Sequence, residues 1–274
     1  TKRNGNPLGT IENFEVMLGY NQIKPRYNLI SKQLEVHIPG VTSTVDNMDN
    51  VALSHIISLA SKNEFPTTNI ADYLSAIGDR NAYNPVAMWI ASKPWDGVDR
   101  ITKLIETIPT QTPELKQILM LRWLVGAVAV LFCERQTELH GVLVLKGKQG
   151  TGKTKWTRAL LPDNLSEQYI LTGAMLDPAS KDSVMGCISN WIVELGELGA
   201  TMRKADQDRL KAFLTNPVDR LRRPYARMES TFQRRTTFIA SVNDERFLKD
   251  ASGDRRYWVI EVDGMINYSH GLDM

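Results

Sequence analysis

The chain has 274 residues, which can form one large domain or two smaller ones. Hydrophobic residues make up 42% of it and charged residues 23%, and both shares are ordinary for a globular protein. The net charge of +2 excludes nucleic-acid binding through overall charge, so any such surface must be local. Cys133 and Cys187 lie among apolar residues without metal-ligand spacing, and we expect both to be reduced core residues of a cytoplasmic protein. The chain begins at Thr1 with no signal peptide, and because it lacks an initiator Met we expect it to be a fragment or processed piece of a longer protein.

Residues 1–108 are expected to form a small, mainly helical domain that contains a hairpin. Apolar residues at helical spacing predict the helices, and alternation around Ser31 and Lys32 predicts the hairpin. Gly78 is the expected stop of the third helix. The predicted elements are helices at residues 10–18, 46–60, 69–77 and 101–108, and a hairpin at residues 26–38.

Residues 109–274 are expected to form an α/β domain, in which a mostly parallel sheet carries helices on both faces. Short apolar strands alternate here with helix-compatible segments, and this alternation predicts parallel pairing. The apolar run at residues 123–133 is shorter than the about 20 residues of a membrane span, so it indicates a core helix. The predicted helices lie at residues 113–135, 153–161, 182–189 and 203–215, and the strands at residues 142–145, 191–193, 236–241 and 257–262.

A glycine-rich loop, G-K-Q-G-T-G-K-T at residues 147–154, joins the first of these strands to a helix. It has the Walker A pattern in its expected strand–loop–helix setting. The glycines let backbone amides point at phosphate oxygens, Lys153 reaches the β- and γ-phosphates, and the Thr154 hydroxyl binds Mg²⁺. A glycine-rich turn without catalytic meaning is the alternative. We expect ATP and Mg²⁺ as cofactors, and the predicted ATP-binding residues are Gly147, Gly150, Thr151, Gly152, Lys153, Thr154 and Lys155.

Two glutamates follow the next apolar strand. Hydrolysis of ATP requires acidic side chains that hold Mg²⁺ and orient the attacking water. Glu194 stands at the Walker B position and is the predicted magnesium ligand beside Thr154. Glu197 is predicted to be the base or to support it, but the usual adjacent Asp-Glu pair is missing, so either glutamate can be the base. Glu197 can also be only the first-turn acid of the following helix.

Polar residues flank the last two strands. Asn243 follows the strand at residues 236–241, where its amide can bind the γ-phosphate or the attacking water; a turn-forming asparagine is the alternative. Arg255 and Arg256 precede the last strand. They can supply positive charge to a transferring phosphoryl group, in an oligomer from a neighbouring subunit. A solvated basic turn is the other interpretation of this pair.

Together these motifs resemble the virulence-associated protein E family, P-loop ATPases of phages and mobile elements related to superfamily 3 and poxvirus-type primase-helicases. The resemblance covers residues 80–262 and implies an AAA+-like core, ring assembly with a hexamer favoured, ATP-driven work on DNA, and a primase in the same chain or operon. It also implies Asn243 as a sensor and Arg255 or Arg256 as a trans-acting finger. Family patterns commonly have Asn where this chain has Asp254. The motifs are W-D-G-V-D-R at residues 95–100, the P-loop, W-I-V-E-L-G-E-L at 191–198, K-A-F at 211–213, R-P-Y-A-R at 223–227, S-V-N at 241–243 with F-L-K-D at 247–250, and G-D-R-R-Y-W at 253–258.

An arginine-rich stretch lies between the Walker B strand and the Asn243 strand, with six arginines from Arg220 to Arg235. Related ring helicases place a hairpin from this stretch into their central channel. Arginines with an aromatic residue suit single-stranded nucleic acid, because they pair with phosphates and stack on bases. Alternatively, some of them neutralise ATP phosphates or a neighbour's carboxylates, or form a packed turn. The predicted DNA-binding residues are Arg222, Arg223, Tyr225 and Arg227.

The sequence therefore favours an ATP-hydrolysing motor on single-stranded or forked DNA, as the helicase part of a primase-helicase. We expect a homo-oligomeric ring, a primase domain or partner, no membrane association, and a cytoplasmic location in a bacterial or phage-infected cell. Two alternatives stay open. One is an ATP-dependent DNA-binding or assembly module that does not unwind, and the other is a small-molecule P-loop kinase.

Overall fold

The computed structural model describes residues 2–3, 5–133, 141–196, 204–221, 229–243 and 255–269. The chain divides into two compact units, Thr1–Pro85 and Val86–Met274. This division falls earlier than the expected boundary at residue 108, because the residues around Thr107 are bound by the second unit. The Trp156 indole N–H donates a hydrogen bond to Thr107 Oγ1 (2.8 Å), and Lys116 Nζ donates to the Ile108 carbonyl (2.7 Å).

The first unit packs helices and a hairpin around an apolar core, as expected. Phe14, Ile56 and Leu74 are among the buried residues of this core. The Thr10 hydroxyl caps the first helix by accepting a hydrogen bond from the Asn13 amide (3.4 Å). The elements are β1 (Lys2–Arg3), β2 (Asn6–Pro7), α1 (Ile11–Tyr20), β3 (Lys24–Asn28), β4 (Gln33–His37), η1 (Val45–Asn47), α2 (Met48–Lys62) and α3 (Ile70–Arg80).

Gly78 does not end the third helix, in contrast to the prediction. It lies inside α3 and is buried, and a Cβ at this position would lie 2.2 Å from Leu34 Cδ1 of strand β4. The missing side chain lets the hairpin pack closely on the helix. Packing against the hairpin therefore explains this glycine better than helix termination does.

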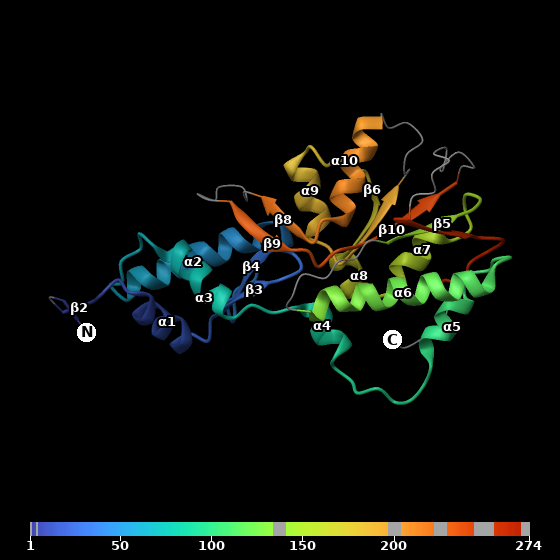
Figure 1. Ribbon diagram of the computed structural model, residues 1–274. Helices are drawn as coiled ribbons and strands as arrows, with labels where there is room; N and C mark the ends of the chain where they lie inside the picture. Colours follow the sequence, from blue (N-terminus) through green and yellow to red (C-terminus); the bar gives the residue numbers. More distant parts are fainter. Residues whose placement is uncertain are drawn as a thin grey trace. The chain divides into compact units, whose positions relative to one another are not determined.

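The second unit is built on a five-stranded parallel sheet, which confirms the predicted AAA+-like α/β class (Figure 1). The strand order is β11-β5-β10-β7-β6. The last of these was missed in the sequence, because Thr172 and Gly173 interrupt its apolar run and its pairing shifts register there. The strands are β5 (Val142–Lys146), β6 (Ile170–Ala174), β7 (Ile192–Gly196), β10 (Thr237–Val242) and β11 (Tyr257–Glu261).

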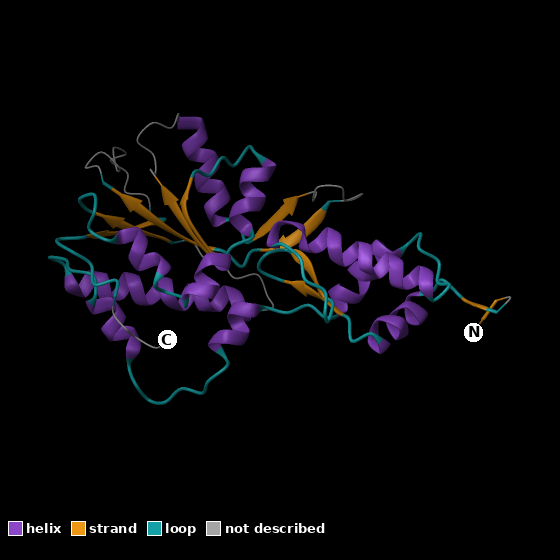
Figure 2. Ribbon diagram, turned by 180° about the vertical axis from the view of Figure 1, so that it is seen from behind, coloured by secondary structure: helices purple, strands orange, loops and turns teal. Residues whose placement is uncertain are grey.

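Helices cover both faces of this sheet, and Figures 1 and 2 show α9 and α10 on the side opposite to α6. Val144 and Leu195 point to the first of these faces, where they form a core with Ile188 of α9 and Leu214 of α10. The helices of the unit are α4 (Pro85–Ile90), α5 (Arg100–Glu106), α6 (Pro113–Phe132), α7 (Lys153–Arg158), α8 (Asp163–Tyr169), α9 (Lys181–Ile188) and α10 (Lys204–Thr215).

Helix α6 is long and apolar enough to cross a membrane by length and composition. One of its faces packs on the sheet, whereas Ile118, Val125 and Phe132 are exposed, so the prediction of a buried core helix is confirmed only for the face toward the sheet. Met120, Trp123 and Val130 are buried. The Trp123 indole N–H donates to the Phe238 carbonyl of β10 (2.8 Å), and the Trp191 indole N–H donates to the Ala127 carbonyl of α6 (2.8 Å). The helix is therefore bound to the sheet by two tryptophans, one on the helix itself and one directly before β7.

An antiparallel hairpin of β8 (Val218–Leu221) and β9 (Ser230–Gln233) stands apart from the main sheet. The two cysteines also differ from expectation in part. Cys187 is buried, and this burial raises the pKa of its thiol to about 11. Cys133 is exposed, so the prediction of two core cysteines was wrong for Cys133, which follows the last turn of α6.

Candidate nucleotide-binding site

The glycine-rich loop lies between the carboxyl end of β5 and the start of α7, as predicted. Gly150 and Gly152 have φ values of +82° and +95°, a backbone region that favours glycine. Gly147 is required for space instead, since a Cβ there would lie 2.8 Å from the Val262 carbonyl oxygen. The loop therefore needs glycine at all three positions, each for a local reason.

Lys153 is buried, and its ammonium group faces the inside of the loop. It donates to the carbonyls of Gly147 (2.7 Å) and Lys148 (2.8 Å), and to Asn243 Oδ1 (3.0 Å). Burial lowers the pKa of Lys153, and the nearby Glu194 carboxylate opposes this shift. A cation at the centre of a ring of oxygens is arranged to exchange those partners for phosphate oxygens.

Glu194 joins the loop to the neighbouring strands. Its Oε1 accepts hydrogen bonds from Thr154 Oγ1 (2.8 Å) and from the Ser241 hydroxyl. The residue lies inside β7, opposite Ile239 of β10, and not at the strand's end as the sequence had indicated. The strand extends to Gly196, because β10 continues to pair with it there.

These oxygens fit a magnesium ion. Glu194 is 1% exposed, and its Oε2 has no hydrogen-bond partner among the described residues. Magnesium in phosphate sites takes one or two carboxylates together with phosphate oxygens and waters. It therefore does not need a cluster of three ligating side chains, and none is found in the described ranges. Thr154 and Glu194 are the predicted ligands, and the structure brings them into contact.

A pocket of about 460 Å³ opens over the loop. Asn243 lines it from the end of β10, together with Ser241. Met265 and Tyr268 line it from the segment that follows β11, and sequence reasoning missed both of them. No sequence motif marks these two residues, and they lie more than a hundred positions after the loop in the sequence.

Arg255 and Arg256 lie far from the phosphate site of their own chain. They precede β11, which runs parallel to β5 and pairs Tyr257 with Val142 and Glu261 with Lys146. The arginines are therefore at the amino end of β5, whereas the loop follows its carboxyl end. A five-residue strand spans about 16 Å. The structure does not bring this pair together with Lys153 and Glu194.

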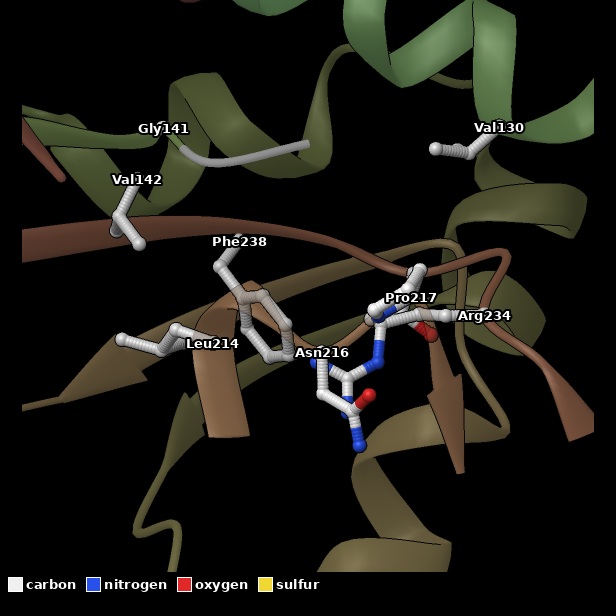
Figure 3. A pocket seen from close by; sticks show the side chains of 9 residues that line it. Val130, Gly141, Val142, Leu214, Asn216, Pro217, Arg234 and Phe238 are labelled. Atoms are coloured by element: carbon white, nitrogen blue, oxygen red, sulfur yellow. The ribbon is translucent and has the colours of Figure 1, made fainter. Parts of the chain in front are cut away.

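The arginine-rich stretch divides into two parts. Arg234 is buried and forms an ion pair with Asp219, with its guanidinium 4.1 Å from the Phe213 ring centroid. It borders a cavity of about 10 Å³, shown in Figure 3, which has room for about one water molecule. Arg235 donates to the Val130 and Leu131 carbonyls at the end of α6. Both arginines therefore support the fold.

The remaining predictions in this region lie outside the described residues. They are Glu197 and the four candidate DNA contacts Arg222, Arg223, Tyr225 and Arg227. The four contacts belong to residues 222–228, which connect β8 to β9 in the sequence.

The geometry is that of a P-loop on an α/β sheet, with polar side chains from neighbouring strands gathered at the loop. The profile of the virulence-associated protein E-like domain matches residues 90–273, more than half of the chain. The protein belongs to this family.

Solved structures support the fold assignment. The C-terminal region of NrS-1 aligns with a TM-score of 0.55 and 18% identity, over 91% of this chain and 60% of that one. The chain thus spans about three fifths of that structure. JCV helicase aligns over 93% of this chain and 74% of that one, but its TM-score of 0.30 and 11% identity are too low to carry an argument. A comparison with curated proteins finds no match.

Proposed function

We propose that the chain is an ATP-hydrolysing motor that acts on DNA, as the helicase part of a primase-helicase in the cytoplasm of a bacterial or phage-infected cell. The observation that carries this proposal is the contact network of the loop. Lys153 is hydrogen-bonded to Asn243, which follows β10, and Thr154 is hydrogen-bonded to Glu194 in β7. A loop that only bound phosphate would not need acidic and amide groups from two further strands.

In the proposed reaction, water attacks the γ-phosphorus and the bond from that phosphorus to the bridging β,γ-oxygen breaks, which gives ADP and phosphate. Lys153 exchanges its loop carbonyls for β- and γ-phosphate oxygens. Asn243 lies where it can hold the γ-phosphate or the water. The proton of the water passes to a glutamate, for which we propose Glu197, because Glu194 is already held by Thr154 and Ser241.

The proposed reaction also requires a bound Mg²⁺ ion. Thr154 and Glu194 would hold it, and when bound it would neutralise charge on the β- and γ-oxygens. The unpartnered Oε2 of Glu194 is the feature that supports this role.

We further propose that Arg255 or Arg256 acts on the ATP of a neighbouring subunit in a homo-oligomeric ring, for which a hexamer is favoured. The support is their place at the edge of the sheet opposite to the loop of their own chain. An arginine supplied in trans can stabilise the charge of the transition state.

The proposed track is single-stranded or forked DNA. Arg222, Arg223, Tyr225 and Arg227 belong to the connection between the paired strands β8 and β9, and arginines and aromatics at such a connection suit phosphates and bases. Arg234 and Arg235 are left out of this proposal because the fold uses them.

The test is ATP hydrolysis with and without single-stranded DNA, for the wild-type chain and Lys153→Ala. We expect turnover that DNA stimulates, and a loss of at least about 100-fold in the variant, since the lysine stabilises the transferring phosphoryl group. Lys181→Ala, at an exposed lysine that begins α9, is the matched control, and it should retain turnover. A wild-type chain that binds ATP but never hydrolyses it would instead indicate an assembly module, and phosphate transfer to a small molecule would indicate a kinase.

A further inference from the structure

The segment after β11 is fixed against the P-loop. The Val262 amide donates to the Lys146 carbonyl (2.7 Å), and the Ile266 amide donates to the Thr151 carbonyl (2.9 Å). Ile266 is buried, and the Asn267 amide donates to the Thr107 carbonyl (3.1 Å). Residues 262–268, which we call the tail, are therefore hydrogen-bonded both to the P-loop and to the turn after α5.

This tail brings an aromatic ring to the loop. A Cβ on Gly152 would lie 2.9 Å from Tyr268 Cδ1, so the ring lies directly against the loop backbone. Lys155 Nζ lies 4.9 Å from the ring centroid, within the range of a cation–π contact. Tyr268 is partly buried, and Met265 beside it is 67% exposed. Both side chains line the pocket over the loop.

The two ends of a bound triphosphate can be assigned from the contacts. Lys153 and Thr154 mark the γ-phosphate end, because their partners Asn243 and Glu194 come from β10 and β7. The rest of the nucleotide must leave the pocket on another side. Among the described lining residues outside the loop, only Met265 and Tyr268 come from neither β10 nor β7; they follow β11, which lies on the other side of β5. In a triphosphate bound in this orientation, the nucleoside end would point to the tail.

We propose that Tyr268 and Met265 form the wall that binds the nucleobase, with the tyrosine ring stacked on the base. This proposal rests on the proposed ATPase function and names the residues that hold the nucleoside. Stacking on an aromatic ring uses the face of the base, and the methionine thioether adapts to its edge. The ring is prearranged, since the tail hydrogen bonds and Lys155 hold it before ATP arrives.

The test compares two ligands by calorimetry, ATP and inorganic tripolyphosphate, on the whole chain. Tyr268→Ala should weaken ATP binding by about 5- to 100-fold, the range expected for a lost stacking contact. Tripolyphosphate binding should stay within about twofold, because that ligand has no base. Tyr268→Phe should bind ATP like the wild type. Tyr20→Ala, a tyrosine that is 91% exposed in the first unit, is the matched control.

The outcomes separate three cases. Unchanged ATP binding in Tyr268→Ala overturns the proposal, and so does an equal loss for both ligands, which would mean that the tyrosine only supports the loop. Lys153→Ala should weaken both ligands. A wild-type chain that binds neither ligand overturns the ATPase function and the base wall with it.

Discussion

One oxygen of Glu194 accepts hydrogen bonds from both Thr154 and Ser241, and the other accepts none among the described groups. A buried carboxylate oxygen without a partner is costly unless a cation binds it. This unequal arrangement supports the proposed role of Glu194 as a magnesium ligand. Its bonded oxygen is already used for positioning, and its open oxygen suits a metal.

Replacement of Glu194 by glutamine tests this role. The amide keeps the shape and can still accept from Thr154 and Ser241, but it lacks the charge that binds Mg²⁺. We expect hydrolysis to fall by about 100-fold or more and the required Mg²⁺ concentration to rise. ATP binding without Mg²⁺ should change by less than about threefold. Titration of Mg²⁺ in a hydrolysis assay measures this.

Glu167→Gln, an exposed glutamate of α8, is the control for that experiment. An unaltered magnesium requirement in Glu194→Gln would contradict the ligand role.

At the residue level, the contact between Thr154 and Glu194 could be anticipated from the sequence. Thr154 comes after β5 and Glu194 lies within β7, and parallel strands bring their carboxyl ends to one edge of the sheet. Tyr268 could not be anticipated, since its contact with Gly152 depends on where the tail after β11 turns. Arg234 was counted with a basic surface, because charge along a sequence does not reveal which side chain is buried beside Asp219.

At the scale of elements, the β8–β9 hairpin depends on that buried ion pair. Arg234 follows β9, Asp219 lies within β8, and the guanidinium also contacts Phe213 of α10. One side chain thus connects both strands to a helix. The buried pair of Arg234 and Asp219 therefore joins the hairpin to α10.

Arg234→Ala should therefore destabilise the protein by about 3–5 kcal/mol, because it leaves the Asp219 charge buried without a partner. Arg220→Ala, an exposed arginine of β8, should change the free energy of unfolding by less than about 0.5 kcal/mol. Urea unfolding followed by circular dichroism measures both. Equal, small effects would show that the buried pair does not stabilise the hairpin.

Elements with a clear period or cap were predictable, and those shaped by their neighbours were not. Helix α1 has its Thr10 cap, and α6 has a long apolar pattern. Strand β6 contains Gly173 at φ +68° and pairs along only part of its length, so its sequence shows no strand pattern. The course of α3 through Gly78 was decided by packing on β4, which no local signal records.

At the scale of the whole molecule, the described residues that line the candidate nucleotide site all belong to the second unit. Thr107 contributes hydrogen bonds to Trp156 of α7 and to Asn267 of the tail, although it lies before the expected boundary. Leu104, Ile105 and Ile108 are buried in the same region. The segment between residues 86 and 108 is therefore part of the unit that carries the candidate nucleotide site.

Two truncations test this division. Residues 86–274 should bind ATP within about threefold of the whole chain. The fragment of residues 109–274 lacks the acceptors of the Trp156 and Lys116 hydrogen bonds. A buried donor without an acceptor costs about 1–3 kcal/mol, so this fragment should unfold at a temperature at least about 5 °C below that of residues 86–274. Calorimetric scans with and without ATP compare the two. Equal stability of the two fragments would place the boundary at residue 108 after all.

The course of residues 255–268 has a consequence for communication between sites. Arg255 and Arg256 lie at one end of this segment and Tyr268 at the other, and β11 between them pairs with β5 along its length. In the ring that we propose, this single segment would therefore connect the base wall of one subunit to the phosphates bound by its neighbour. The nucleotide held by one subunit and the charge offered to the next would then depend on the same stretch of chain.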